Sequence, residues 1–335
     1  MPARELAIRL ASAVVTLFGV AVAVFVVIRL APGDPIAMML PPGAGPEDIA
    51  RLREAYGLDR GIPAQFAIWL GDVLRGDFGT SISLRQDVAR LVLGRLPATL
   101  ELATFALLIA CGLGGALAIL GTLKRGTGAE TAVDLWNGMT LSVPDFLWGL
   151  GFIVLLGVAW PIFPVSGRVS PALEIDYATN FLLIESLVRL DLAVTGNLLS
   201  HMTLPAVALA LPLAAVISQL LKQALKEVME RDYLMLARAK GFSESAAIFR
   251  DGLRNAVLPT LTLAGVQFTF LIGGTVIVER LFSYEGLGNL AIDAVINRDL
   301  PLIQGIVLMF SALFVAINLA VDLAYAALNP RLRDA

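Results

Sequence analysis

The feature that most constrains this 335-residue chain is a set of about six long apolar runs. A helix of about 20 apolar residues crosses the ~30 Å hydrocarbon core of a bilayer, and lipid-exposed backbone must satisfy its own hydrogen bonds. The sequence therefore predicts an all-α polytopic membrane protein with about six transmembrane helices. The expected spans are residues 10–28, 99–123, 133–160, 204–221, 258–278 and 302–325.

Composition agrees with a membrane protein and narrows its chemistry. Hydrophobic residues make up 57% of the chain and charged residues only 16%, whereas about a quarter of the residues in a soluble domain are charged. The single cysteine, Cys111, excludes an internal disulfide, and the single histidine, His201, is too little for a zinc or haem site built by the protein. We therefore expect no metal site in this chain.

The first apolar run has two interpretations. Arg4 and Arg9 precede it, as in a signal peptide, but the run is longer than the usual core of ~7–15 residues and no small-x-small cleavage site follows it. We predict a retained span, with a cleaved signal peptide as the alternative.

Basic residues predict the orientation of the spans. Every lysine lies in a loop on one side of a six-span topology that starts inside the cell, and many arginines share that side. Because loops rich in Lys and Arg stay cytoplasmic, both termini are predicted to be cytoplasmic. The segment 31–97 is then extracytoplasmic, where it would either cover the span ends or bind a soluble partner. The lysines are Lys124, Lys222, Lys226 and Lys240.

The interiors of the spans carry few charges. This argues against an ion-coupled secondary transporter, because such proteins place carboxylates, histidines or lysines near mid-membrane to couple the ion to the solute. Four acidic residues near span ends are expected to reach the interface or to pair with a neighbouring helix. They are Glu101, Asp134, Glu279 and Asp322.

Asp145 is the exception, because it lies inside the third apolar run, directly after Pro144. Proline removes a backbone donor, so we expect a kink at Pro144 and freed backbone groups that need polar neighbours. Asp145 and Phe146 are therefore candidates to line a pathway, with a purely structural role as the alternative.

No catalytic constellation is visible in the sequence. Proteolysis within a bilayer needs a serine with a histidine, paired aspartates or a metal set, and His201 has no convincing partner. The run 121–126 begins like a phosphate-binding loop but lacks the lysine and hydroxyl after its second glycine. The chain is therefore predicted not to be an enzyme and not to hydrolyse ATP itself.

A charged loop, residues 223–257, separates the fourth and fifth spans. Apolar residues at helical spacing indicate that the fourth helix continues into water. Gly241 is expected to end this helix in the left-handed conformation, and Ser243 to cap a new short helix. The apolar stripe expected on the short helix consists of Ala246, Phe249 and Leu253.

The chain resembles the permeases of ABC importers in the dipeptide, oligopeptide and nickel branch. Its loop is similar to their EAA loop through Tyr233, the run 237–241, the run 253–256 and Pro259. Further motifs along the whole chain resemble the first permease of such importers, in the same order. They occupy residues 29–35, 76–81, 96–102, 164–167, 278–288 and 318–325.

Three positions depart from that branch. Gln219 and Lys222 stand where its members have arginines, and Asn329 replaces an aspartate near the C-terminus. The last change is expected to affect only a local turn.

The resemblance implies a single permease domain over residues 1–335, with the type I ABC-importer transmembrane fold, in the bacterial inner membrane. It implies no cofactor in this chain, since ATP and magnesium would be bound by two cytoplasmic ATPase subunits or domains. A homologous second permease would complete the pathway within the lipid bilayer, and an extracytoplasmic substrate-binding protein would deliver the solute. No nucleic acid partner is expected.

The resemblance also assigns a coupling role to the loop 223–257. Short peptides are the expected solute, with nickel chelates, glutathione, opines or another small solute as alternatives, and an ion-coupled secondary transporter as the alternative of another class. The residues expected to contact the ATPase are Ala237, Gly241, Phe242, Ser243, Glu244 and Phe249.

Overall fold

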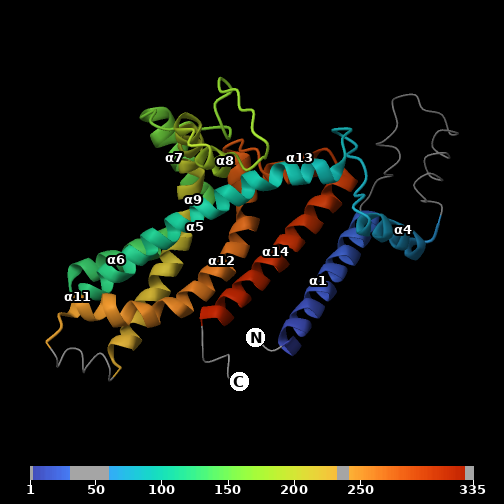
Figure 1. Cartoon of the computed structure of the whole chain (residues 1–335). Helices are drawn as coiled ribbons and strands as arrows, with labels where there is room; N and C mark the ends of the chain where they lie inside the picture. Colours follow the sequence, from blue (N-terminus) through green and yellow to red (C-terminus); the bar gives the residue numbers. More distant parts are fainter. Residues whose placement is uncertain (1–2, 31–59, 232–240, 329–335) are drawn as a thin grey trace. The chain divides into compact units, whose positions relative to one another are not determined.

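The computed structural model of the protein describes residues 3–30, 60–231 and 241–328. Three parts of the sequence predictions lie outside these residues: residues 31–59 of the outer segment, residues 232–240 of the coupling loop, which include Ala237, and the turn at Asn329. The described residues fold almost entirely into helices, shown in chain order in Figure 1.

Five helices of the described residues are long and apolar enough to cross a membrane. A sixth span follows if two shorter helices separated by a bend are counted as one, which agrees with the predicted number of about six. The five are α1 (Ala3–Leu30), α5 (Val88–Leu123), α9 (Leu192–Met229), α12 (Leu253–Leu281) and α14 (Leu300–Leu328). Several extend beyond the predicted limits, and α5 begins well inside the segment predicted to be extracytoplasmic.

The bent pair confirms the kink predicted at Pro144. Helix α6 (Gly128–Ser142) ends there, and α7 (Asp145–Phe152) continues as the π-helix Ile153–Ala159, with an angle of 97° between the two parts. Val143, which precedes the proline, is extended with φ −106° and ψ 121°. A residue before proline is sterically disfavoured in the α region, so the chain leaves the helix one residue early and the break is wider than a simple kink.

The chain divides into two compact units. The first contains residues 97–289 and the chain from Ala316 onward, and the second contains residues 3–96 and 290–315. Helices α5 and α14 therefore contribute residues to both units.

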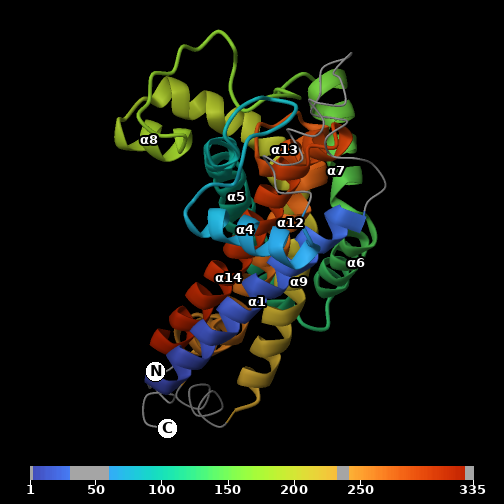
Figure 2. The ribbon, with the colours of Figure 1, turned by 90° about the vertical axis from the view of Figure 1, so that its right-hand side faces the viewer.

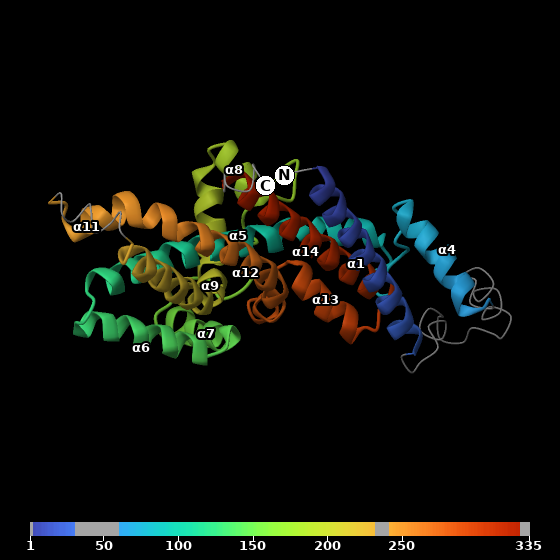
Figure 3. The same ribbon diagram turned by 90° about the horizontal axis from the view of Figure 1, so that it is seen from below.

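In the first unit, α9 lies between α6 and α12, as Figure 3 shows from below. Buried alanines on α9 let its neighbours approach closely, which replaces the hydrophobic drive that is absent within lipid. Gly114 of α5 faces the carbonyl of Ala214 so closely that a Cβ atom would clash, and Gly149 of α7 meets Leu281 in the same way. Gly114 and Gly149 thus allow close helix packing, whereas Gly112, Gly115 and Gly151 face open space.

In the second unit, α4 (Ile62–Leu74) lies against α1 (Figure 2), and aromatic rings fill the contact. Phe25 lies 5.3 Å from Phe66 and 5.4 Å from Trp69, measured between ring centroids. Arg29 of α1 donates a hydrogen bond from Nε to Oε1 of Gln65 on α4 at 2.9 Å, which adds a polar contact between the two helices. The part of the outer segment that is described therefore includes a helix held against the first span.

The buried Asp299 organises the loop that precedes α5 in the second unit. One of its oxygens, Oδ2, accepts from the hydroxyls of Ser81 at 2.6 Å and Ser83 at 2.7 Å, and from the backbone amide of Ser83 at 2.9 Å. Burial by itself would raise the pKa of this carboxyl, but the hydroxyl and amide donors outweigh it and leave the pKa below its usual value.

Candidate functional site

The end of α9 predicted to be cytoplasmic carries a buried cation held by two acids of α6. Lys222 Nζ lies 2.8 Å from Asp134 Oδ1 and 2.9 Å from Glu130 Oε1, and its side chain is only 6% exposed. Lys226, one turn further along α9, lies 3.2 Å from the same Glu130 oxygen. The two acids and the two lysines each stand four residues apart, so each pair shares one helix face. The pairing expected for Asp134 is confirmed.

This charged cluster also holds the tight turn between α5 and α6. Glu130 Oε2 accepts the backbone amide of Gly126 at 2.7 Å, and Gly126 adopts φ +74°. A lysine buried at this depth is stable only if its charge is paired, so the turn and α9 are fixed to each other by Lys222.

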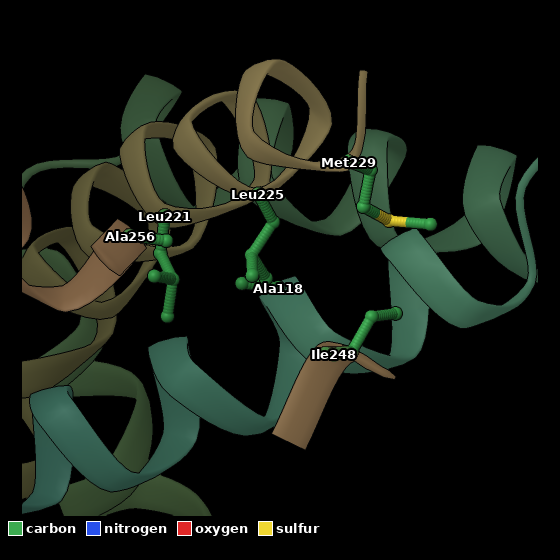
Figure 4. Packing of buried hydrophobic residues seen from close by; sticks show 6 residues of the cluster. All are labelled: Ala118, Leu221, Leu225, Met229, Ile248 and Ala256. Carbon is green, nitrogen blue, oxygen red and sulfur yellow. The ribbon is translucent and has the colours of Figure 1, made fainter. Parts of the chain in front are cut away.

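An apolar cluster lies at the same end of the unit (Figure 4). The spacing of its α9 members, four residues apart, places them on one face of that helix. Ile248, from the loop after α9, is fully buried among them. The buried members of the cluster are Ala118, Leu221, Leu225, Met229, Ile248 and Ala256.

The loop itself forms the expected turn and cap. Gly241 adopts φ +86°, the left-handed conformation that favours glycine. Helix α11 (Glu244–Ala247) follows, and Ser243 Oγ accepts the backbone amide of Ala246 at 3.3 Å. The left-handed conformation of Gly241 and the Ser243 cap are confirmed, and Glu244 opens the helix as predicted. The fourth helix, however, already ends at Met229, so Gly241 does not end it.

The predicted stripe of Ala246, Phe249 and Leu253 is wrong. Leu253 packs against the apolar cluster, but Phe249 is 57% exposed and the buried residue is its neighbour Ile248. The reason is a π-helical turn, Ile248–Gly252, which follows α11 directly. A π-helix has more residues per turn than an α-helix, so the α-helical spacing assumed from the sequence does not describe this face.

Two aromatic residues of the predicted coupling set are exposed at this end of the unit. Phe242 is 40% exposed with the Arg250 guanidinium 5.0 Å from its ring centroid, and Phe249 is 57% exposed. Ile248 fixes the backbone beneath them. Exposed aromatic side chains beside a short helix, with the buried Ile248 fixing the backbone, are suited to insertion into a groove of another protein.

Comparison with known proteins assigns the family. Residues 104–334 match the binding-protein-dependent transport system inner membrane component, and residues 3–103 match the N-terminal region of the same membrane component. The chain belongs to this family. It is therefore an inner-membrane, multi-pass permease subunit of an ABC importer, and it is a transport component rather than an enzyme, as predicted.

Relatives of this permease are similar over nearly their whole length. The dipeptide transport system permease DppB of Escherichia coli (strain K12) is 37% identical over 331 residues, covering 97% of each chain. The glutathione transport system permease GsiC of Salmonella typhi is 35% identical over 329 residues, again covering 97% of each chain.

A solved structure supports the fold of the permease. An inward-facing form of the MetNI methionine ABC transporter has a TM-score of 0.54 at 16% identity, covering 71% of this permease and 96% of that chain. The predicted all-α, type I importer fold is thereby confirmed. A binding-protein-dependent system of this kind works with an ATPase, a substrate-binding protein and a second permease.

The break between α6 and α7 places Asp145 in a pocket of the permease with a volume of about 390 Å³. Its neighbour Phe146 is 37% exposed and donates its backbone amide to Asp145 Oδ1 at 2.7 Å. The sequence singled out Asp145 but gave no sign of Gln267 of α12, which lines the same pocket. Gln267 carries no charge and follows no motif that would have revealed it.

Two further acids of the first unit, Glu101 and Glu279, are bound to neighbouring elements, as expected. Glu101 binds the buried Arg168 at 2.7 Å and accepts the amide of Leu183 at 2.9 Å. Glu279 accepts the hydroxyl of Thr99 at 2.8 Å and the amide of Gly288 at 2.8 Å. These acids join segments of the fold that are distant in sequence, and their oxygens are already occupied.

Proposed function

We propose that this permease carries short peptides inward across the bacterial inner membrane. The observation that carries the proposal is the similarity over 97% of the chain to permeases named for dipeptide and for glutathione transport. Both solutes are short peptides, although their side chains differ. Nickel chelates, opines or another small solute are the alternatives.

In this proposal a homologous second permease completes the pathway and a soluble binding protein delivers the peptide from outside. Two cytoplasmic ATPase subunits or domains bind ATP and magnesium, and this chain binds neither. The exposed Phe242 and Phe249, together with Gly241 and Ser243, form the surface that enters the ATPase. The resemblance adds Ala237 and Glu244 to the same role.

The apolar cluster gives that surface a route into the membrane helices. Ile248 contacts the end of α9, while Ala118 of α5 and Ala256 of α12 complete the same cluster. A displacement of α11 is therefore transmitted to α5, α9 and α12 together, because a close-packed interior transmits strain. ATP-driven movement of the ATPase pair would in this way open the pathway to one side or the other.

The test is uptake by the reconstituted complex. This chain is expressed with the second permease, ATPase and binding-protein genes of its operon, and uptake of a short-peptide mixture is measured in proteoliposomes. Uptake that requires ATP and the binding protein supports the proposal. Uptake driven by an ion gradient without ATP would instead make the chain a secondary transporter, and ATP hydrolysis stimulated by the binding protein without peptide uptake would exclude peptides.

The coupling loop has its own test, Gly241→Asp. A residue with a side chain is strained at φ +86°, and the new charge lies beside the exposed Phe242. We expect membrane insertion to persist and uptake to fall to background. Gly76→Asp is the matched control, because Gly76 has φ +88° and open space around it but lies in the outer segment. Full transport by Gly241→Asp, or loss of insertion, would contradict the coupling role.

A further inference from the structure

The pocket at the break between α6 and α7 has walls from two helix faces. Its α9 residues and its α12 residues each follow the spacing i, i+3, i+4, i+7 that marks one side of a helix. The break itself closes the remaining side with Pro144 and Asp145. The wall residues are Leu209, Pro212, Leu213 and Val216 on α9, and Gln267, Phe270, Leu271 and Gly274 on α12.

Only two side chains in this lining can form strong hydrogen bonds, Asp145 and Gln267. No basic side chain lines the pocket, and among the described residues no cation forms an ion pair with Asp145. The carboxylate instead accepts the backbone amide of the adjacent Phe146. An acid within a transmembrane segment costs at least ~2.5 kcal/mol unless a partner compensates it, so a carboxylate without a cation at this place indicates a functional site.

The space beside the carboxylate is open. Gly274 faces it, and a Cβ atom added there would lie 3.6 Å from Asp145 Oδ2, at ordinary contact distance. Leu141 and Phe270, also in the lining, are 42% and 67% exposed, so the pocket opens to the outside of the chain. A group entering from that side can reach the carboxylate without moving the helices.

We propose that this pocket is a transient subsite for the ammonium group of the solute in transit, with Asp145 as its charge partner. The inference rests on the proposed function and deepens it, because every short peptide with a free amino terminus carries that group. Gln267 supplies a neutral amide for the adjacent peptide group, and the leucines and Phe270 accept an apolar side chain. The volume of about 390 Å³ lies within the range of small-molecule sites.

The first test measures charge preference without any transport step. Cys111 is replaced by Ser, Leu141→Cys is introduced at the pocket, and the assembled importer in nanodiscs is labelled with a trimethylammonium and with a sulfonate methanethiosulfonate reagent of similar size. With Asp145 present, the cation should react faster. Asp145→Asn should lower the cation-to-anion rate ratio about tenfold, since one charge a few ångströms away is worth one to a few kcal/mol at a protein surface. Val216→Cys is a second labelling site if Leu141→Cys fails to assemble.

The control variants distinguish the effect of the Asp145 charge from that of the other charges of the protein. Asp145→Glu should restore the ratio. Asp176→Asn removes an exposed acid of the loop before α8 (Leu182–Val188) and should leave it unchanged. An unchanged ratio in Asp145→Asn would overturn the proposal. So would the absence of any cation preference in the assembled importer, because it would mean that a residue of the second permease neutralises Asp145.

The second test uses alanyl-alanine and its N-acetylated form as competitors of labelling. Alanyl-alanine should protect the cysteine at least several-fold better than the acetylated peptide, and Asp145→Asn should abolish the difference. Equal protection by the two peptides would overturn the ammonium assignment. Peptide uptake is measured separately. A charge preference with protection by alanyl-alanine but without ATP-dependent uptake would refute the proposed function and keep the subsite.

Discussion

Two of the acid sites in the first unit are built in opposite ways. At the end of α9, Lys222 neutralises Glu130 and Asp134 at distances of 2.8–2.9 Å. At the break between α6 and α7, Asp145 faces an apolar pocket with no cation beside it among the described residues. The ion pair at the first site joins two helices, whereas the carboxylate at the second site, beside an open pocket and without a cation, is available for a ligand.

Breaking the paired site should have the largest effect on stability. Lys222→Met leaves Asp134 without a cation and Glu130 with Lys226 alone, and we expect a loss of about 3 kcal/mol in the free energy of unfolding, because removing one partner of a buried ion pair is strongly destabilising. Unfolding of the purified permease in mixed detergent micelles measures it. Lys124→Met, at an exposed lysine of the nearby turn, is the control and should change the free energy by less than ~0.5 kcal/mol. Lys222→Arg should retain stability, and an unchanged Lys222→Met protein would refute the structural role of the cluster.

Opening a cavity in the apolar cluster should have the next largest effect. Ile248→Ala removes buried methyl groups and should cost about 2 kcal/mol, since the short helix can partly relax into the space. The loss should appear mainly as uncoupling, with fewer peptides imported per ATP hydrolysed. Ile277→Ala, at a position 55% exposed on α12, is the matched control. Equal coupling ratios in the two variants would show that Ile248 does not transmit the movement.

At Asp145 a substitution should have little effect on stability and a large effect on transport. Asp145→Asn should change the free energy of unfolding by less than ~1 kcal/mol, with either sign, because no ion pair is lost. Peptide uptake should nevertheless fall about tenfold. Parallel unfolding and uptake measurements on Asp145→Asn and Lys222→Met would sharpen the comparison, and a large loss of stability in Asp145→Asn would place Asp145 with the structural acids.

A hydrogen-bonded acid outside the spans gives the smallest effect, which should disappear in acid. Donors from Ser81 and Ser83 hold the pKa of Asp299 below its usual value, so its contribution to stability is fully present above the unfolded pKa of about 3.9. The contribution should be lost as the pH falls from there through the lower folded pKa. Wild type and Asp299→Asn should therefore approach each other in stability below about pH 4. A constant difference between them from pH 7 to pH 3 would contradict this.

The comparison also shows why some parts of the coupling region were predictable and others were not. Gly241 and Ser243 act through local backbone geometry, and both were recognised from the sequence. The burial of Ile248 instead of Phe249 was missed because the π-helical turn has no recognised signature in the sequence. The pairing of Lys222 with Asp134 joins residues 88 positions apart, so only its local half, an acid near a span end, could be expected.

The apolar runs, the break at Pro144, the left-handed turn at Gly241 and the family could all be read from the amino-acid sequence alone. The reason is that hydrophobic length, proline sterics and glycine freedom act over a few residues, and that motifs persist in order along the chain. The folded chain was needed to show which acids have a cation beside them, that Ile248 anchors the coupling helix and that Gln267 lines the same pocket as Asp145. These properties depend on how separate helices pack, because the residues that pair a charge or bury an apolar side chain come from helices that are distant in the sequence.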